Sequence, residues 1–98
     1  PMTCWLYLEY DGAGQGFGGY ALDDPVRIAD GSMTRKGTAY GMDFITAILR
    51  VVGVQCWEEL PGKYVRVRRD HNKIYEIGHI IKDVWFNPSA LYNAHAKD

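Results

Sequence analysis

Five glycines fall within eight positions of the segment Asp11-Gly-Ala-Gly-Gln-Gly-Phe-Gly-Gly-Tyr20, directly after the first apolar run of the chain. Glycine has no Cβ, so its backbone can turn through positive φ and approach a ligand closely. Free N–H groups in such a loop can bind an anionic group such as phosphate. A flexible hairpin connection is the alternative interpretation. As a ligand site, the loop would contribute Gly14, Gln15, Gly16, Phe17, Gly18 and Tyr20.

The glycine segment matches no established phosphate-binding motif. It lacks the Lys-Ser/Thr ending of a P-loop, and a short strand rather than a helix is expected after it. The segment therefore indicates a backbone surface open to a ligand, and it indicates binding more than chemistry.

A second candidate site is the basic segment 63–73, which holds five basic residues and one acidic one. Arg66 and Arg68 share one face of the expected strand, where they could bind phosphate groups bidentately. Lys82 is a further candidate cation, and His79 could meet a ligand or a carboxylate. The alternatives are a solvated strand face whose arginine stems cover apolar surface, and a partly buried histidine with its own partners.

Nothing in the chain indicates catalysis. Glu58 and Glu59 are adjacent and point in different directions, which does not suit a pair of catalytic carboxylates. The spacing of three histidines and two cysteines predicts no metal cluster. We therefore expect no enzyme activity, no metal and no cofactor.

Length and composition predict one domain over residues 1–98, since 47% of the residues are hydrophobic. Residues 1–33 carry five acidic side chains and one basic one, whereas residues 34–98 carry ten basic and seven acidic ones. This asymmetry indicates a polarised surface or head-to-tail self-association. The net charge of −1 is less basic than that of a dedicated nucleic-acid-binding protein.

The elements that must position these residues are predicted from periodicity and from capping residues. The clearest is a helix from Ala39 to Val52, with Thr38 as its N-cap and Gly53 at its C-terminal end. Strands are expected at 3–10, 19–22, 63–69 and 74–83, with a brief edge strand at 26–29. The predicted fold is α+β, an antiparallel sheet of four or five strands on one main helix, in the order β-β-(β)-α-β-β. Residues 89–98 are expected to be a frayed tail.

The apolar arc of the expected helix is wider than one small sheet usually covers. It predicts either a deeply buried helix or a contribution to an oligomer interface, and we expect a homo-oligomer. Pro1, ahead of Met2, is interpreted as a cloning remnant. We find neither a signal peptide nor an apolar stretch long enough to span a membrane. With Cys4 and Cys56 interpreted as reduced thiols, we expect a protein of the cytoplasm.

Three stretches in order carry a resemblance: Gln15-Gly-Phe-Gly-Gly-Tyr20, Trp57-Glu-Glu-Leu-Pro-Gly-Lys-Tyr-Val-Arg-Val67 and Ile77-Gly-His-Ile-Ile-Lys-Asp-Val-Trp-Phe86. Over about residues 5–88 the chain resembles small, uncharacterised proteins encoded by bacteriophages and prophages. The resemblance implies a setting, the bacterial host cell, and no catalytic residue. Small phage proteins of this kind often act against bacterial immunity, either by blocking an effector, as anti-CRISPR proteins do, or by sequestering a nucleotide messenger.

The leading hypothesis is a phage-encoded counter-defence protein, dimeric or larger, that sequesters a nucleotide-like immune signal without catalysis. In it the glycine loop supplies N–H groups, and Phe17 or Tyr20 supplies a stacking face. The cation for phosphate would be Arg66, Arg68 or Lys82. The first alternative is a protein–protein inhibitor of a bacterial defence complex, acting through its acidic 9–30 region. The second is single-stranded nucleic-acid binding by the basic hairpin.

Overall fold

The computed structural model describes residues 1–10, 12–71 and 73–96. Within these residues the strands form three separate antiparallel sheets. They are β1 (Thr3–Tyr10) with β2 (Ala13–Ala21), β3 (Asp23–Arg27) with β4 (Met33–Gly37), and β5 (Val65–Arg69) with β6 (Ile74–His79) and β7 (Trp85–Phe86). The predicted α+β class is confirmed. The single sheet of four or five strands is not, because the described strands divide among these three sheets.

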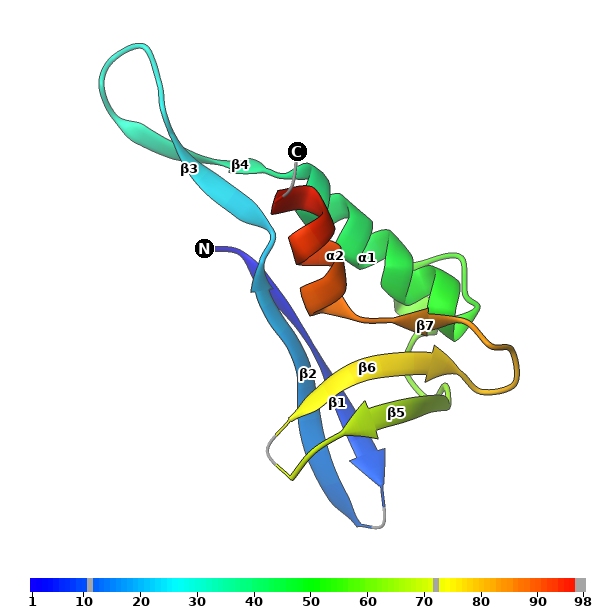
Figure 1. Cartoon of the computed structure of the whole chain (residues 1–98). Coiled ribbons are helices and arrows are strands. Elements are labelled where there is room, and N and C mark those ends of the chain that lie inside the picture. Colours follow the sequence, from blue (N-terminus) through cyan, green and yellow to red (C-terminus); the bar gives the residue numbers. More distant parts are fainter. Residues whose placement is uncertain (11, 72, 97–98) are drawn as a thin grey trace.

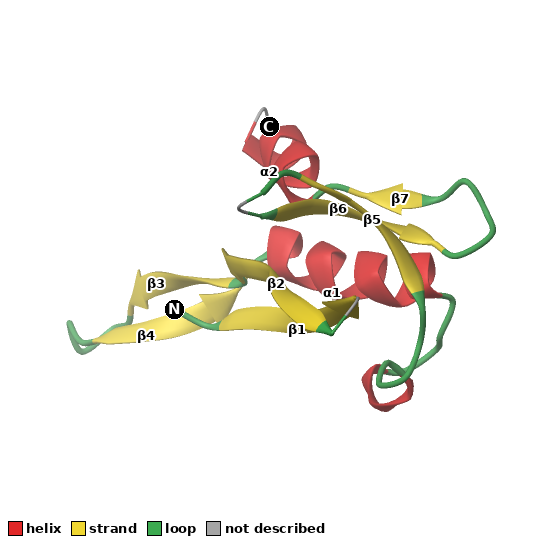
Figure 2. Ribbon diagram, turned by 90° about the horizontal axis from the view of Figure 1, so that it is seen from below, coloured by secondary structure: helices red, strands yellow, loops and turns green. Residues whose placement is uncertain are grey.

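Two helices complete the body. Helix α1 (Ala39–Val52) lies between the β1–β2 ribbon and the three-stranded sheet, and α2 (Pro88–Ala96) lies beside α1 (Figures 1 and 2). A short 3₁₀ turn, η1 (Trp57–Glu59), interrupts the connection from α1 to β5. One aromatic cluster joins the layers: the ring centroid of Phe44 in α1 lies 6.4 Å from that of Phe17 in β2 and 5.3 Å from that of Phe86 in β7.

Helix α1 has the predicted bounds and both predicted caps. The Thr38 hydroxyl accepts a hydrogen bond from the Gly41 N–H at 2.9 Å, which satisfies one of the free donors of the first turn. At the other end Gly53 has a φ of 90°, and its N–H reaches the Leu49 carbonyl. The side chains of Phe44 and Ile48 are fully buried, so this helix forms the centre of the core.

The β3–β4 ribbon projects from the body as an arm, and the molecule measures 52 × 29 × 28 Å (Figure 1). Beyond Asp23, no residue of the ribbon is buried. Both faces of the ribbon carry charged side chains, Asp24 and Lys36 on one face and Arg27 and Arg35 on the other, so neither face offers an apolar surface to pack against the core. This is why these strands do not join the sheet that the sequence predicted.

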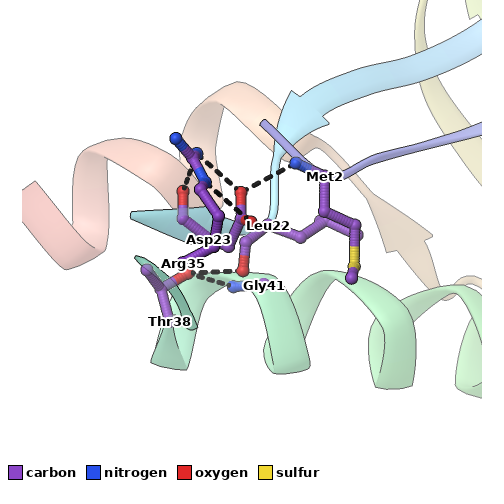
Figure 3. A network of polar contacts seen from close by, with 6 residues as sticks. All are labelled: Met2, Leu22, Asp23, Arg35, Thr38 and Gly41. Atoms are coloured by element: carbon purple, nitrogen blue, oxygen red, sulfur yellow. Dashed lines mark hydrogen bonds and ion pairs between the residues drawn. The ribbon is translucent and has the colours of Figure 1, made fainter. Parts of the chain in front are cut away.

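Polar contacts fix the base of the arm (Figure 3). The buried carboxylate of Asp23 accepts hydrogen bonds from the Arg35 guanidinium at 2.8 and 3.0 Å and from the Met2 N–H at 2.8 Å. The hydrogen bond from Arg35, followed by that from Met2, lowers the pKa of Asp23 to about 2. Thr38 links the other strand of the arm to Leu22 through its N–H and its hydroxyl.

The expectation of a frayed C-terminal tail is corrected. Residues 89–96, expected to be frayed, belong to α2, because Tyr40 donates a hydrogen bond to the Pro88 carbonyl and packs edge-on against Tyr92 and His95. The last residues of the predicted tail, 97 and 98, lie outside the described part. In the described residues no helix is long and apolar enough to cross a membrane.

Candidate functional site

The glycine segment is a strand and not a loop. Described from Gly12 onward, it runs through β2 and pairs with β1 along its whole length. Trp5 lies opposite Gly18, and Tyr7 lies opposite Gly16. The glycines at 14 and 16 therefore share one face with the two aromatic side chains, since opposed residues of a ladder point to the same side.

Aromatic rings occupy the space that side chains on β2 would need. A Cβ built on Gly14 would overlap the Tyr7 ring, and one on Gly19 would lie 2.7 Å from Cη2 of Trp5. At Gly16 the nearest atom of the Trp5 ring would be 3.1 Å away. The glycines thus allow Trp5 and Tyr7 to lie across β2, an arrangement that also shields a glycine-rich strand from water.

A groove runs along the edge of β2 that faces away from β1. We call it the β2 groove, and its walls are formed by Trp5, Gly16, Gly19, Tyr20, Lys73 and Tyr75. Its volume is about 430 Å³, within the range of small-molecule sites. Among the described strands none pairs with this edge of β2. The groove thus combines aromatic side chains and one cation.

Lys73 is the cation of the β2 groove. Its ammonium lies 3.4 Å from the Tyr20 hydroxyl and 5.6 Å from the centre of the Tyr20 ring. The same hydroxyl lies 2.9 Å from Oγ of Ser89, which holds Tyr20 against α2. The described residues place no carboxylate within ion-pair distance of Lys73. The Asp70 carboxylate accepts a hydrogen bond from the Lys73 backbone N–H at 2.9 Å.

The structure brings four of the predicted site residues together and separates the others. Gln15, Gly16, Gly18 and Tyr20 all line the β2 groove. Phe17 is only 1% exposed and belongs to the core, because it alternates with the glycines and so points to the opposite face of β2. Gly14 lines a separate depression beside the β1–β2 turn.

Arg66 and Arg68 do not line the β2 groove, because both are engaged with Trp85. The guanidinium carbons of Arg66 and Arg68 lie 4.8 and 3.9 Å from the centre of the Trp85 ring. Arg66 also donates hydrogen bonds of 2.8 Å to the carbonyls of His79 and Lys82. Arg68 forms an ion pair with Glu76 at 2.9 Å. These contacts correspond to the alternative interpretation, in which the arginine stems cover apolar surface.

His79 and Lys82 belong to the same clamped turn between β6 and β7. Nδ1 of His79 accepts hydrogen bonds from the N–H groups of Ile81 and Lys82, at 3.0 and 2.9 Å. His79 is half-buried and has its own partners, as the second interpretation of that residue proposed. Neither residue lines the β2 groove.

Sequence reasoning missed Trp5 and Lys73 as groove residues. Trp5 belongs to the strand expected over residues 3–10, and it is 64% exposed. The signal for it is the alternation of Trp5 and Tyr7 with Cys4, Leu6 and Leu8, which separates an outer aromatic face from an inner one. No sequence signal identifies Lys73, because its place beside Tyr20 depends on how β6 packs against β2.

A second groove, about 420 Å³ in volume, lies between β1 and residues 57–65. Its lining is mostly aliphatic, with Leu6, Leu8 and Leu60 among its members. It shares Trp5 with the β2 groove, it contains none of the β2 glycines, and Glu58 and Lys63 are its charged members.

The described residues contain no group of three or more metal-binding side chains. The exposed thiol of Cys56 donates a hydrogen bond to Glu59 at 3.1 Å, and this contact, with the neighbouring Glu58, raises the thiol pKa to about 11. A thiol protonated at neutral pH is a weak nucleophile. The side chains that line the β2 groove can stack on a planar ring, donate hydrogen bonds and neutralise an anion.

No protein-family model matches the chain, and neither a curated protein nor a solved structure is significantly similar to it. The functional argument therefore depends on the geometry of the site and on the residues that form it.

Proposed function

We propose that this protein is a non-catalytic binding protein that captures a nucleotide-like small molecule in the β2 groove. One observation carries the proposal: the exposed aromatic faces of Trp5 and Tyr75 line the same groove as the ammonium of Lys73. Aromatic side chains stack on any nucleobase, and each stacked base contributes about 1–3 kcal/mol. A lysine supplies the charge that a phosphate requires.

The glycines place the Trp5 ring in the wall of the groove. At Gly16 and Gly19 that ring lies directly over β2, because neither position carries a side chain. In this proposal the Lys73 ammonium binds the phosphate group of the ligand. Arg66 and Arg68 hold the β6–β7 turn instead, through their contacts with Trp85 and with backbone carbonyls.

The resemblance to small phage proteins supplies a biological setting for such a binder. A protein that binds an immune messenger tightly and does not turn it over lowers its free concentration in the infected host cell. We propose counter-defence by sequestration on this basis, with the protein acting as a homo-oligomer in the bacterial cytoplasm.

Calorimetry and thermal shift with a panel of linear and cyclic nucleotides would test the proposal. We expect at least one nucleotide to bind with one site per chain. Trp5→Ala and Lys73→Ala should each weaken binding on the order of 10-fold or more, because each removes a stacking face or a charge. Native mass spectrometry of protein purified from infected cells should show whether that nucleotide is retained and in which oligomer.

Lys63→Ala is the matched control for Lys73→Ala. Lys63 is an exposed lysine outside the β2 groove, and its removal should leave affinity unchanged. Equal losses from both variants would mean that only net charge matters and would argue against a phosphate site at Lys73. A protein that ignores every nucleotide in the panel would overturn the proposed function.

The β3–β4 arm favours a second candidate function, inhibition of a host defence protein by direct contact. Isolated two-stranded ribbons are marginally stable in water, yet this one is held rigidly at its base by Asp23 and Arg35. Near its tip it exposes Ile28 and Met33, whose side chains are 44% and 55% exposed. An arm of this shape presents an apolar tip to a partner.

Substitutions at the tip separate the two candidate functions. Ile28→Asp combined with Met33→Asp should abolish capture of a host protein while leaving nucleotide binding intact. Trp5→Ala should have the reverse effect. Capture that survives the double substitution would exclude the arm as the inhibitory surface.

A further inference from the structure

The β6–β7 turn exposes apolar side chains at the end of the three-stranded sheet (Figure 1). Ile80 and Ile81 are 49% and 83% exposed, and no other large hydrophobic side chain of the described residues is as exposed as Ile81. Val84, at the end of the turn, is exposed as well. Adjacent exposed apolar groups on a projecting turn are typical of a surface that binds a partner.

Hydrogen bonds hold this turn in one shape. Nδ1 of His79 accepts hydrogen bonds from the N–H groups of Ile81 and Lys82, and the N–H of His79 donates to the Val84 carbonyl at 2.9 Å. From β5, Arg66 donates to the carbonyls of His79 and Lys82. A segment that is already ordered loses little conformational entropy when it binds. The turn therefore presents its isoleucines in a fixed position.

The chain also carries an apolar groove, the one between β1 and residues 57–65, which we call the β1 groove. Its aliphatic lining includes Leu6, Leu8 and Leu60, and residues 80–84 of the turn do not line it. Figure 2 shows the β6–β7 turn and η1, the small red helix beside this groove, at separate places on the molecule. The turn therefore does not fill the groove of its own chain. A projection and a groove on different parts of one molecule meet between copies, in a head-to-tail contact.

The charges of the turn and of the β1 groove are complementary. The turn carries exposed Lys82 and Asp83, and the groove carries exposed Glu58 and Lys63. Each charge of the turn thus has an opposite charge at the groove. Opposite charges placed across an interface select the partner and fix its register. An occupant with one charge of each sign suits this groove better than a uniformly charged one, and the turn of a second copy is such an occupant.

We propose that the β6–β7 turn of one copy inserts Ile81 into the β1 groove of a second copy. Lys82 then faces Glu58 of the second copy, and Asp83 faces its Lys63. This inference rests on the homo-oligomer of the proposed function and assigns the two surfaces that form it. Because the two surfaces differ, the contact is heterologous, and it gives a ring where the rotation between copies closes.

Sedimentation velocity of the full-length chain over a range of concentrations tests the contact. The wild type should form an oligomer, and Ile81→Asp should raise its dissociation constant on the order of 30-fold or more, the effect expected of a central apolar contact. Met42→Asp is the matched control, because Met42 is 65% exposed in α1 and lies outside both surfaces. It should assemble as the wild type does. Equal melting temperatures of the dissociated variants would show that both still fold.

Charge reversal tests the direction of the contact. In Lys82→Glu the turn and the groove both present a carboxylate, and in Glu58→Lys both present an ammonium. Each variant alone should assemble on the order of 10-fold more weakly, because like charges then meet at the interface. An equal mixture of the two should regain the wild-type oligomer, since the turn of each variant then meets an opposite charge in the groove of the other. A mixture that stays dissociated would exclude the pairing of Lys82 with Glu58.

The outcomes separate this interface from nucleotide capture. Ile81→Asp should still bind the nucleotide, and Lys73→Ala, which lies outside both surfaces, should still assemble. If Ile81→Asp assembles as tightly as the wild type, or if the wild type is a monomer at every concentration, the assigned interface is wrong and the nucleotide site is unaffected. A monomer that needs Ile81 to capture a host protein would assign the turn to that partner instead of a second copy.

Discussion

The indole of Trp5 occupies the space that a side chain at Gly19 would fill. A Cβ on Gly19 would lie 2.7 and 2.8 Å from Cη2 and Cε2 of the indole, and the glycine itself has a φ of 84°. Trp5 belongs to β1 and Gly19 to β2. A side chain at position 19 would displace the ring, and the ring in turn leaves room only for glycine at that position. The wall of the β2 groove thus exists because position 19 carries no side chain.

Gly19→Ala should therefore cost stability for two reasons, the strained backbone and the displaced ring. Gly62 has the same φ of 84° with nothing near its position, so Gly62→Ala measures the backbone contribution alone. We expect about 1 kcal/mol for Gly62→Ala and about 2–3 kcal/mol for Gly19→Ala, measured by urea denaturation. Equal losses would show that the ring moves aside freely.

We expect Arg66 to stabilise the fold and not to bind the nucleotide. Its two hydrogen bonds to carbonyls of the β6–β7 turn are lost in Arg66→Ala, which we expect to lower the free energy of unfolding by about 1 kcal/mol. Arg66→Lys keeps the charge but not the forked geometry, so it should recover little of that loss. Nucleotide affinity should be unchanged in both. Lost binding at an unchanged melting temperature would place the ligand on the β5–β6 hairpin instead.

The Tyr40 hydroxyl should contribute to the docking of α2 on α1. It donates a buried hydrogen bond of 3.1 Å to the Pro88 carbonyl, and Tyr40→Phe removes that donor. We expect a loss of about 1 kcal/mol in the free energy of unfolding. Tyr92→Phe is the control, because the ring of Tyr92 is 55% exposed and its hydroxyl has no described hydrogen-bond partner.

Burial also raises the pKa of Tyr40 to about 12, and the nearby Tyr20 and Tyr92 add to the shift. An ultraviolet titration of the folded protein should accordingly show one tyrosine that ionises only near that pH. If all tyrosines ionise together near pH 10 while the fold persists, the burial of Tyr40 is wrong.

The Asp23–Arg35 pair should make stability depend on acid pH. The pKa of Asp23 is lowered from 3.8 to about 2 in the folded chain, so the carboxylate stabilises the fold above pH 4. That contribution is lost as the pH falls from about 4 to about 2. Asp23→Asn should lower the melting temperature at pH 7 and flatten its fall across this window.

Asp24→Asn serves as the comparison for the acid experiment. Asp24 is exposed at the next position of β3, and its removal should preserve the wild-type slope. A wild-type slope in Asp23→Asn would mean that other carboxylates produce the acid sensitivity.

Local signals in the sequence were sufficient for the elements that carry their own caps and periodicity. Helix α1 begins after Thr38 and ends before Gly53, as predicted, because both caps act within a few residues of chain. The alternation that places Val65 and Val67 inward and Arg66 outward is equally local, and β5 shows it. The first strand, 3–10, has its predicted bounds for the same reason.

The glycine segment shows where local reasoning stops. Glycines were interpreted as a loop because glycine alone is a poor strand former. What makes β2 a strand is contact with another one: Trp5 and Tyr7 cover its glycine face, and Phe17 on the other face enters the core.

The sequence by itself determined the α+β class and the main helix with its caps, since each depends on residues close together in the chain. Only the tertiary structure decided which side chains meet. It placed Lys73 beside Tyr20, 53 positions earlier, and it placed the Arg66 guanidinium over the Trp85 ring. Such pairings depend on how separate sheets pack, and packing is a property of the whole chain rather than of any segment.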